Sequence, residues 1–336
     1  MDGLIHFHLF PLFLSKCKKV KRILVTGAYG QIGTVLTEAL REKYGVAAVL
    51  ATDLHPNDAE IGAFELLDIL DEKRLREIVD LYEISEIYHL AAVLSAVGEK
   101  NPRLAWKVNM EGLMNVLEVA KDNKLRVFFP SSIAAFGGAS PKDMTPQDAI
   151  MQPQTVYGIS KVASENWCSY YHENYGVDVR SVRYPGIIGY QSLPGGGTTD
   201  YAVEIFHKAI AGDDYACFLK EDATMPMMYM DDAIHATIEL MEAPLEQLTV
   251  RTSYNIAAFS FSPLEISNEI RKYFPDFKVS YIPDFRQKIA DSWPRSIDDS
   301  IACRDWNWQP KFTFQSMVKD MIEQLQVKSG HHLINK

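Results

Sequence analysis

Apolar, strand-forming runs alternate with amphipathic helical segments through the first half of the chain, and this alternation restricts the possible fold more than any other feature. The strand-like runs lie at 22–27, 46–53, 86–92, 126–132 and 177–188. The helical segments between them lie at 31–44, 71–82, 103–123 and 157–174. Strands and helices that alternate in this way form βαβ units, with parallel strands and helices on both faces of the sheet. The sequence therefore predicts an α/β fold with a Rossmann-type, doubly wound parallel sheet.

The rhythm changes after Pro185, where loops rich in Pro and Gly separate shorter elements. Helices and short strands are expected near 200–211, 232–242, 279–282 and 310–325. A chain of 336 residues exceeds the usual size of a single core, so we expect two lobes. The predicted division is a leader or extension at 1–21, a Rossmann lobe at 22–185, a smaller substrate-binding lobe at 186–325 with segments mixed back onto the first, and a tail at 326–336. In such a sheet the ligand crevice lies outside the carboxyl ends of the strands.

Charge and cysteine content argue against several classes of function. The formal net charge of −10 makes nucleic acid or an anionic membrane an unfavourable main partner. The four cysteines are scattered without metal-ligand spacing, so we expect neither a bound metal nor a disulfide framework.

The amino-terminal segment is a short apolar stretch followed by a group of cations. These cations are Lys16, Lys18, Lys19, Lys21 and Arg22. The stretch is too short to span a membrane, and its charges lie on the wrong side for a secretory signal. A cation-rich leader with almost no acids fits an organellar import segment. We therefore expect a mitochondrial location, with a plain extension of a cytoplasmic protein as the alternative.

The first expected strand runs directly into the glycine-rich loop TGAYGQIG, which contains Gly27, Gly30 and Gly33 and leads into a helix. Glycines at this spacing let the backbone turn tightly and approach a pyrophosphate at the helix amino terminus. Asp53 ends the second strand, where a carboxylate accepts from both adenosine ribose hydroxyls and repels a 2′-phosphate. The arrangement predicts NAD rather than NADP. The alternative is a tight turn beside a solvent-facing aspartate.

A second acid, Asp68, follows an expected third strand in the segment LLDILD. From that position its carboxylate would reach the adenine amino group of the cofactor. A helix cap accounts for the same residue equally well, because aspartate is a favoured residue at helix amino termini.

A tyrosine and a lysine in the segment VYGISK form the candidate catalytic pair. Tyr157 and Lys161 are four residues apart at the start of an expected helix, and therefore lie on one face of it. A free tyrosine has a pKa of about 10, which a nearby ammonium and a positive nicotinamide would lower toward that of a useful base. Ser132, at the end of the expected strand at 126–132, is placed to hydrogen-bond the reacting oxygen. Ser131 is its nearest competitor.

These motifs together resemble the extended short-chain dehydrogenase/reductase family. TGAYGQIG matches its fingerprint, HLAA at 89–92 its fourth strand, VNMEGLMNVLEVA at 108–120 its next helix, and SSIAAFG and YGISK its catalytic segments. The resemblance covers nearly all of 22–325 and implies NAD as the cofactor. By motif position it implies cofactor contacts from Gly27, Gly30, Gln31, Ile32, Gly33, Asp53, Asp68, Leu90, Ala91, Ala92, Asn109, Tyr157, Lys161, Tyr184 and Ile187. For Asn109, a proton relay and support of the fold both fit.

One departure from the family bears on the substrate. Many sugar-nucleotide members carry an arginine on the substrate diphosphate within the motif R-D-Y-I-H-V-x-D. The matching stretch here, MPMMYMDD at 225–232, ends with Asp232 but begins with Met225. Buried phosphates need charge-assisted donors, so this departure counts against a UDP-sugar. The alternative is a replacement cation, for which Arg251, Arg286 and Arg295 are available.

Three other stretches resemble the short-chain type of L-threonine 3-dehydrogenase: LSAVGEKNP at 94–102, RYPGII to PGGGTTDYAVEIF at 183–206, and ADSWPRSIDDSIACRDWNW at 290–308. The resemblance implies an amino-acid pocket lined by Ser95, Ser132, Tyr157, Gly197, Thr198 and Trp293. The glycine run allows close backbone approach to a carboxylate without an arginine. Trp293 fits a core or interface aromatic equally well, and Ser95 also fits a loop hydroxyl without a role.

The resemblance implies NAD-dependent oxidation of the threonine β-hydroxyl to 2-amino-3-oxobutanoate, a step toward glycine and acetyl-CoA. Two alternatives stay open: a sugar-nucleotide epimerase or dehydratase of the same family, and a catalytically silent NAD(H) sensor. The family also implies a homodimer through the helices at 103–123 and 157–174. Their apolar residues would face the partner or lie within one subunit; they are Trp106, Met110, Leu113, Trp167 and Tyr170.

Overall fold

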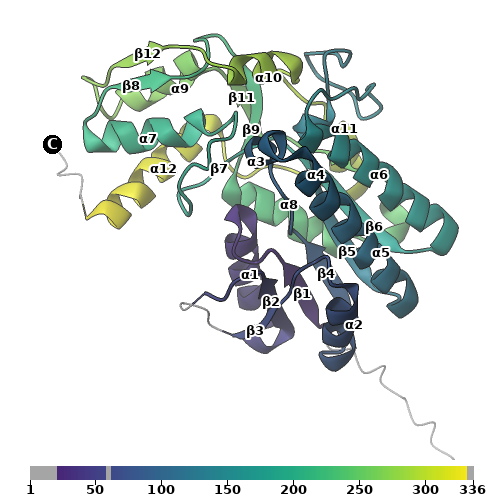
Figure 1. Ribbon diagram of the computed structural model, residues 1–336. Helices are drawn as coiled ribbons and strands as arrows, with labels where there is room; N and C mark the ends of the chain where they lie inside the picture. Colours follow the sequence, from purple (N-terminus) through teal and green to yellow (C-terminus); the bar gives the residue numbers. More distant parts are fainter. Residues whose placement is uncertain (1–20, 58–61, 331–336) are drawn as a thin grey trace, which may run out of the picture.

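A seven-stranded parallel sheet forms the centre of the molecule (Figure 1). The computed structural model describes residues 21–57 and 62–330. The strands of this sheet are β1 (Ile23–Thr26), β2 (Val49–Asp53), β3 (Ala63–Leu66), β4 (Glu86–His89), β5 (Arg126–Ser132), β6 (Asp178–Tyr184) and β10 (Tyr254–Asn255). Their order is β10-β6-β5-β4-β1-β2-β3, and every neighbouring pair is parallel. The predicted Rossmann-type α/β fold is confirmed.

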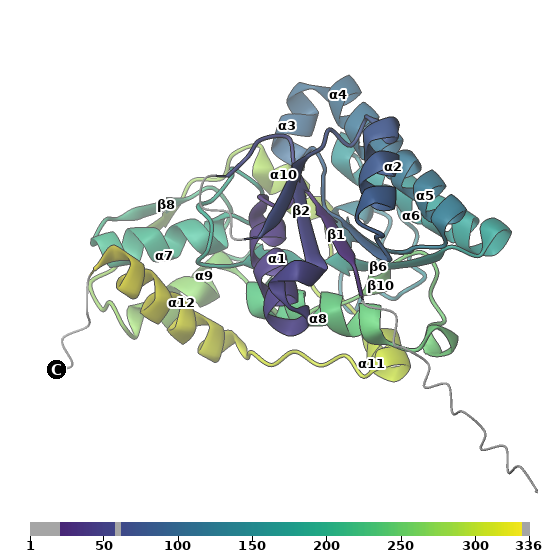
Figure 2. The same ribbon diagram turned by 90° about the horizontal axis from the view of Figure 1, so that it is seen from below.

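Helices cover both faces of the sheet (Figure 2). One face carries α1 (Gln31–Tyr44) and α8 (Met230–Glu242), and the other carries α2 (Glu72–Leu81), α5 (Gly112–Asn123) and α6 (Val156–Tyr175). Alternate residues of β1 pack against the helices on opposite faces of the sheet, since successive strand residues point to opposite faces. Ile23 and Val25 belong to the core shared with α1 and α8, whereas Leu24 belongs to the core shared with α2 and α5.

The expected continuous helix at 103–123 consists of three segments. It contains α4 (Pro102–Trp106), a five-residue π-helical segment (Lys107–Glu111) and then α5. A short helix, α3 (Ser95–Lys100), precedes them. A π-helical turn widens the helix by one residue, and such turns are frequent at functional sites. Here the widened turn contains Asn109, one of the residues expected to contact the cofactor.

The expected single strand at 177–188 is wrong, because the chain forms two strands there that join different sheets. Pro185 separates β6 from β7 (Gly186–Ile188), and a proline offers no N–H to continue the main ladder. β7 instead pairs with β9 (Met225–Tyr229), which also pairs antiparallel with β11 (Phe259–Phe261). Pro185 therefore directs the chain from the main sheet into the smaller lobe.

The smaller lobe surrounds this three-stranded sheet with helices. Its other elements are β8 (Tyr215–Cys217), β12 (Val279–Tyr281), α7 (Tyr201–Ala211), α9 (Pro263–Arg271), α10 (Arg286–Ser292) and α12 (Phe314–Ser329). Two later segments return to the large sheet: α8 covers one face of it, and β10, packed against α11 (Ser300–Trp306), forms its edge. Within the part of the chain that the structure describes, no helix is both long and apolar enough to cross a bilayer.

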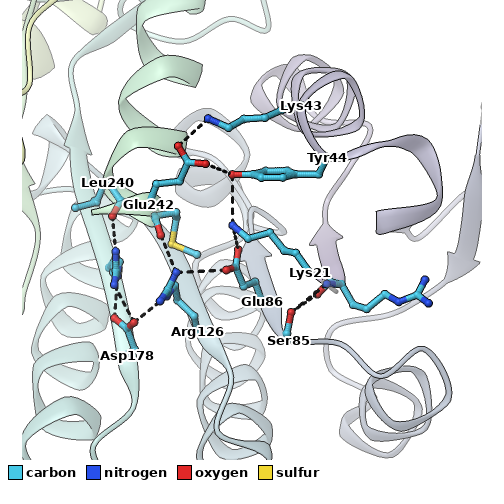
Figure 3. Close-up of polar contacts among 12 residues, drawn as sticks. Lys21, Lys43, Tyr44, Ser85, Glu86, Arg126, Asp178, Leu240 and Glu242 are labelled. Atoms are coloured by element: carbon cyan, nitrogen blue, oxygen red, sulfur yellow. Dashed lines mark hydrogen bonds and ion pairs between the residues drawn. The ribbon is translucent and has the colours of Figure 1, made fainter. Parts of the chain in front are cut away.

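A charged network lies at the amino-terminal edge of the large sheet (Figure 3). Glu86, Arg126 and Asp178 stand at the starts of the neighbouring strands β4, β5 and β6. Arg126 donates to Glu86 Oε1 (3.3 Å) and to Asp178 Oδ2 (2.8 Å). Alternating charges thus pair across three strand starts.

The same network caps the carboxyl end of α8. The Arg180 side chain is completely buried, and its Nη1 donates to the carbonyls of Leu240 (2.7 Å) and Ala243 (2.6 Å). Arg126 Nη1 donates to the carbonyl of Met241 (2.8 Å). The last carbonyls of a helix lack intrahelical donors and carry partial negative charge, so guanidinium groups are suitable caps. The position of α8 on the sheet therefore depends on these two arginines.

We expect Arg180→Met to destabilise the fold while leaving the opposite, ligand-binding edge intact. The substitution leaves two buried carbonyls unpaired and removes one partner of Asp178, which costs about 3 kcal/mol of unfolding free energy. Urea denaturation measures this loss. The control is Lys43→Met, which removes the half-exposed ion pair with Glu242 (2.7 Å) and should cost less than about 1 kcal/mol. Equal losses in the two variants would contradict the buried cap.

Candidate active site

The glycine loop after β1 leaves the amino terminus of α1 open to an anion. Gly30 is the N-cap residue of α1, no side chain caps the helix, and its first turn contains no acid. The first intrahelical bond is donated by Thr34 N–H to the Gly30 carbonyl, so the N–H groups of residues 31–33 have no acceptor within the helix. Free N–H groups and the helix dipole together favour a phosphate group at this point.

Two glycines of this loop are required by close backbone approach. A Cβ on Gly27, whose φ is +69°, would lie 2.7 Å from Ala91 N. A Cβ on Gly33 would lie 2.2 Å from the Gly27 carbonyl oxygen. Any side chain would displace β1, α1 or the loop after β4. The residues present therefore fit the pyrophosphate of a dinucleotide.

Asp53 lies at the end of β2, beside the same loop. Its Oδ2 accepts from Tyr29 N (3.0 Å), and its Oδ1 accepts from Leu54 N (2.7 Å). These backbone donors hold the carboxylate at the carboxyl edge of the sheet, next to the glycine loop. The position fits the adenosine ribose of NAD, and the ribose contact itself stays a prediction.

Asp68 is exposed and is not a helix cap. Its Oδ1 accepts from Leu70 N (3.0 Å), which closes a local turn. The residue that caps α2 is Asp71, whose side chain accepts from Arg74 N (2.9 Å). The helix-cap interpretation of Asp68 is therefore wrong. The adenine contact of this residue stays a prediction.

Asn109 supports the loop that follows β4. Its Oδ1 accepts from Val93 N (2.8 Å), and its Nδ2 donates to the Val93 carbonyl (3.0 Å) and to Ser160 Oγ (3.2 Å). Both N–H groups of the amide are thus engaged inside the protein, which favours support over a proton relay. Leu90 N in turn donates to the Thr26 carbonyl (3.0 Å), so 90–93 is fixed at both ends. The predicted contacts of Leu90, Ala91 and Ala92 belong to this fixed segment.

Ser132, Tyr157 and Lys161 come together at the carboxyl end of β5 and the amino end of α6. Thr155 caps α6 by accepting from Gly158 N (3.0 Å), so Tyr157 lies in the first turn of that helix. The Ser132 hydroxyl lies beside the Tyr157 phenol and acts to lower its pKa. Lys161 Nζ lies 5.3 Å from the centre of the Tyr157 ring and donates to the Pro130 carbonyl (2.6 Å).

The ionisation of this pair differs from the expectation that Lys161 lowers the pKa of Tyr157. Burial raises the pKa of Tyr157 to about 12, and the hydrogen bond from Ser132 opposes that rise. Burial also lowers the pKa of Lys161 to about 8. Desolvation of each group therefore dominates in the protein alone. A positive nicotinamide ring beside the phenol would favour the phenolate.

Ser131, the competing serine, faces away from the catalytic pair. Its Oγ donates to Glu165 Oε1 (2.5 Å), a fully buried carboxylate that also forms an ion pair with Arg183 (2.8 Å). The two serines end one strand, and successive strand residues point to opposite faces. Ser132 is therefore the serine that contacts Tyr157.

Tyr184 does not present its hydroxyl to the cofactor crevice. The phenol is buried, and its oxygen is hydrogen-bonded to Thr237 Oγ1 and to the carbonyl of Ala233, both on α8. The Tyr184 side chain packs into the core under α8, so a cofactor contact at this residue would come from its backbone; that contact stays a prediction. Ile187, on β7, is half-buried against the same core.

The second glycine run, at 195–197, forms a loop whose backbone is hydrogen-bonded by the side chain of Asp200. Gly196 has φ +90°, and Asp200 Oδ2 accepts from Gly197 N (2.8 Å). Thr198 is 5% exposed, and no residue of the described chain hydrogen-bonds its hydroxyl. The contact from Asp200 was missed by sequence reasoning, although an acid three residues after the last glycine was a visible signal. Ser95, the other predicted pocket hydroxyl, is half-buried at the start of α3.

Trp293 ends α10 and is 8% exposed. It belongs to the apolar cluster that contains Ile133 and Ala134, against which Tyr157 packs. The fold thus brings this late tryptophan into the same apolar cluster as Ile133 and Ala134, across more than a hundred residues of sequence. Its burial fits the core-aromatic alternative, and the substrate contact of Trp293 stays a prediction.

The region expected to hold a diphosphate in other family members is apolar here. Met225 is completely buried on β9, and Asp232 accepts from Lys311 N (2.8 Å) and Phe312 N (3.1 Å) instead of facing a ligand. The three arginines considered as replacement cations have partners: Leu245 O for Arg251, Asp284 for Arg286 and Asp143 for Arg295. Across the described residues, no group of three His, Cys, Asp or Glu side chains could hold a metal ion.

Comparisons with known proteins identify the family to which the chain belongs. The model of the "NAD dependent epimerase/dehydratase family" matches residues 23–257. A Staphylococcus aureus protein named "uncharacterized epimerase/dehydratase" is 50% identical over 314 residues, which cover 92% of this chain and 98% of that protein. The holo structure of a "GalE-like L-threonine dehydrogenase" from Cupriavidus necator is 54% identical, covers 90% of this chain and 99% of its own, and has a TM-score of 0.89. A "monomeric L-threonine 3-dehydrogenase" from a metagenome is 49% identical, with 91% and 99% coverage and a TM-score of 0.89.

We expect the protein to bind NAD more tightly than NADP, and Asp53→Ala to remove this preference. The substitution removes the carboxylate that would accept from the ribose hydroxyls, so NAD affinity should fall about tenfold. Calorimetric titration with each dinucleotide measures both constants. The control is Asp80→Asn, an exposed acid of α2 away from the loop. Unchanged NAD affinity in Asp53→Ala would place the ribose elsewhere.

Proposed function

Because the chain belongs to the NAD-dependent epimerase/dehydratase family, we propose that it is a metal-independent L-threonine 3-dehydrogenase. It would oxidise the β-hydroxyl of L-threonine with NAD to give 2-amino-3-oxobutanoate. One observation carries the proposal: Tyr157, with Ser132 on its hydroxyl, packs against an apolar cluster that contains Trp293. Two compared structures with about half of their residues identical are named for this activity.

The walls of the site fit a small amino acid better than a sugar nucleotide. A diphosphate needs charge-assisted donors, whereas Met225 is completely buried, and Arg286 and Arg295 form ion pairs with Asp284 and Asp143. A single carboxylate can be bound by hydroxyl and backbone donors. Thr198, with its free hydroxyl, and the glycine run before it supply donors of that kind.

The chemistry assigned to this chain is a proton transfer and the orientation of one carbinol. The Tyr157 phenolate oxygen takes the proton of the threonine β-hydroxyl, and the Ser132 hydroxyl holds that oxygen by a hydrogen bond. The β-carbon then loses hydride as its C–O bond becomes a carbonyl. NAD, when bound, supplies the hydride acceptor. The Lys161 ammonium, one helical turn below, adds positive charge beside the phenolate.

The family name and the curated relatives favour one other function, epimerisation or dehydration of a sugar nucleotide. The two functions are separated by incubating the protein with NAD and either L-threonine or UDP-glucose while NADH absorbance is followed. Threonine oxidation gives continuous NADH formation with L-threonine and little with L-serine. NADH formation absent with L-threonine, together with turnover of UDP-glucose, would overturn the proposal. NAD binding without any turnover would indicate a silent sensor.

We expect kcat/KM for L-threonine to rise with pH between 7 and 10, because the base is the Tyr157 phenolate and its pKa is raised by burial to about 12 in the protein alone. The Ser132 hydrogen bond lowers that pKa, so Ser132→Ala should move the rising limb to higher pH. Tyr157→Phe should reduce kcat at every pH by about a thousandfold. Steady-state rates over the pH range, with NAD affinity measured in parallel, test all three statements.

The matched control for these variants is Tyr170→Phe, which removes a phenol from an exposed position on the same helix. Its pH profile should coincide with that of the wild type. A flat profile in the wild type, or near-normal turnover by Tyr157→Phe, would remove Tyr157 from the role of base.

We also propose that the protein forms a homodimer through α4 and α6. These helices expose a set of large apolar side chains, namely Leu104, Trp106, Ile159, Trp167 and Tyr170. Single exposed apolar residues are common, but several on neighbouring helices favour a protein interface. Met110 and Leu113 are buried, so for these two residues the interpretation as core within one subunit holds.

We expect light scattering after size exclusion to give twice the mass of one chain. Trp167→Glu should shift the protein toward the monomer, because it places a charge in a desolvated interface. Leu81→Glu, at an exposed position of α2, is the control and should leave the mass unchanged. A wild-type monomer, as the name of the metagenomic relative states for that protein, would contradict the dimer.

A further inference from the structure

Two segments far apart in the sequence are joined side by side between the catalytic helix and Trp293. Arg295 N and Ser296 N donate to the Lys142 carbonyl (2.6 and 3.2 Å). Thr145 N donates to the Ser296 carbonyl (3.0 Å), and Asp298 N donates to the Thr145 carbonyl (3.0 Å). The loop that precedes α6 and the segment that follows α10 are therefore joined along their backbones.

The Lys142 side chain adds a second connection, directed at the end of α10. Its Nζ donates to the carbonyls of Asp291 (2.9 Å) and Trp293 (3.1 Å). These carbonyls lie at the carboxyl terminus of the helix, where the dipole places partial negative charge. The side chain is half-buried, and burial lowers the pKa of Lys142. A partly desolvated ammonium makes stronger hydrogen bonds than one in water.

Trp293 is consequently fixed on both sides of its Cα. Its N–H donates to the Ala290 carbonyl (3.0 Å), and its own carbonyl accepts from Lys142. The backbone at this residue is extended, with φ −89° and ψ 163°, so it leaves the helix sharply. Its indole then enters the cluster against which Tyr157 packs. The Lys142 ammonium thus fixes the backbone from which the indole enters this cluster.

We propose that Lys142 is a positioning residue, whose ammonium holds Trp293 against the bound amino acid and thereby sets the affinity for L-threonine. The role rests on the proposed function. Lys142 touches no reacting atom; it acts through the backbone of Trp293. Its loss loosens one wall of the proposed substrate pocket and leaves the glycine loop and Asp53 of the dinucleotide site unchanged.

The test is a double-mutant cycle between Lys142 and Trp293. Lys142→Met keeps the backbone pairing of 142 with 295 and 296 but removes the ammonium. We expect it to raise the KM for L-threonine about tenfold, the size typical of a lost charge-assisted hydrogen bond, with a smaller change in kcat and unchanged NAD affinity. In a Trp293→Phe background the same substitution should add little, because two residues that act through one contact are not additive. Lys142→Arg, which retains the charge and donors, should recover most of the affinity.

The control is Asp143→Asn, which breaks the exposed ion pair with Arg295 in the same pair of segments. It should leave the KM near that of the wild type. An equal rise in KM when Lys142→Met is added to wild type and to Trp293→Phe would overturn the proposal. A parallel loss of NAD affinity would also overturn it, because that result would indicate general loosening of the fold.

Hydrogen exchange separates failure of this inference from failure of the proposed function. Lys142→Met should increase amide exchange in 286–298 and leave α6 unchanged, whichever substrate the enzyme uses. Increased exchange in that segment without threonine turnover by the wild type would reject threonine as the substrate. It would still support the role of Lys142 in holding Trp293. Unchanged exchange in 286–298 would reject the role of Lys142 in holding Trp293.

Discussion

The buried ion pair between Glu165 and Arg183 holds together the elements that carry the proposed chemistry. Glu165 lies on α6 two turns beyond Tyr157 and also accepts from Ser131 on β5. Arg183, on β6, donates onward to the Gln147 carbonyl (2.9 Å) and to Asn255 Oδ1 of β10 (3.0 Å). A buried pair adds little net stability over apolar packing, but loss of one partner leaves an unpaired charge and costs about 3–5 kcal/mol. Helix, catalytic strand and edge strand are therefore fixed relative to one another, and Ser132 and Tyr157 with them.

The amino and carboxyl ends of the strands in the large sheet differ in what surrounds them. At the amino edge, arginines cap α8, and Tyr44 at the end of α1 donates to Glu242 (2.6 Å), so the helices on that face are fastened where no ligand is expected. At the carboxyl edge the amino terminus of α1 has free N–H groups, and the glycines before it permit close approach. A parallel sheet places all strand ends of one kind on one side. Stability and binding are thereby separated in space, which allows the binding edge to stay open.

Local signals explain what was predictable from the sequence. The bounds of α1 and the loop before it follow from a strand, three glycines and a helical repeat within 22–44. The joining of β6 and β7 to separate sheets, the Asp71 cap and the acid beneath the second glycine run depend on a partner strand or on hydrogen bonds that spacing does not specify. The Lys142 contact joins residues 151 positions apart, and nothing near either residue indicates it. The raised pKa of Tyr157 likewise depends on burial by another lobe, not on its distance from Lys161 along the helix.

Under the proposed function, the amino-acid site and the dinucleotide site would meet at the β-carbon of the substrate, beside Tyr157. Transfer of hydride from that carbon is therefore the step to test. The most direct measurement uses L-threonine deuterated at the β-carbon, with mass analysis of the reduced cofactor. Oxidation at the β-carbon predicts that every NADH formed carries deuterium, and that none carries it when the label is at the α-carbon. Unlabelled NADH from β-deuterated threonine, or no NADH at all, would contradict the assignment.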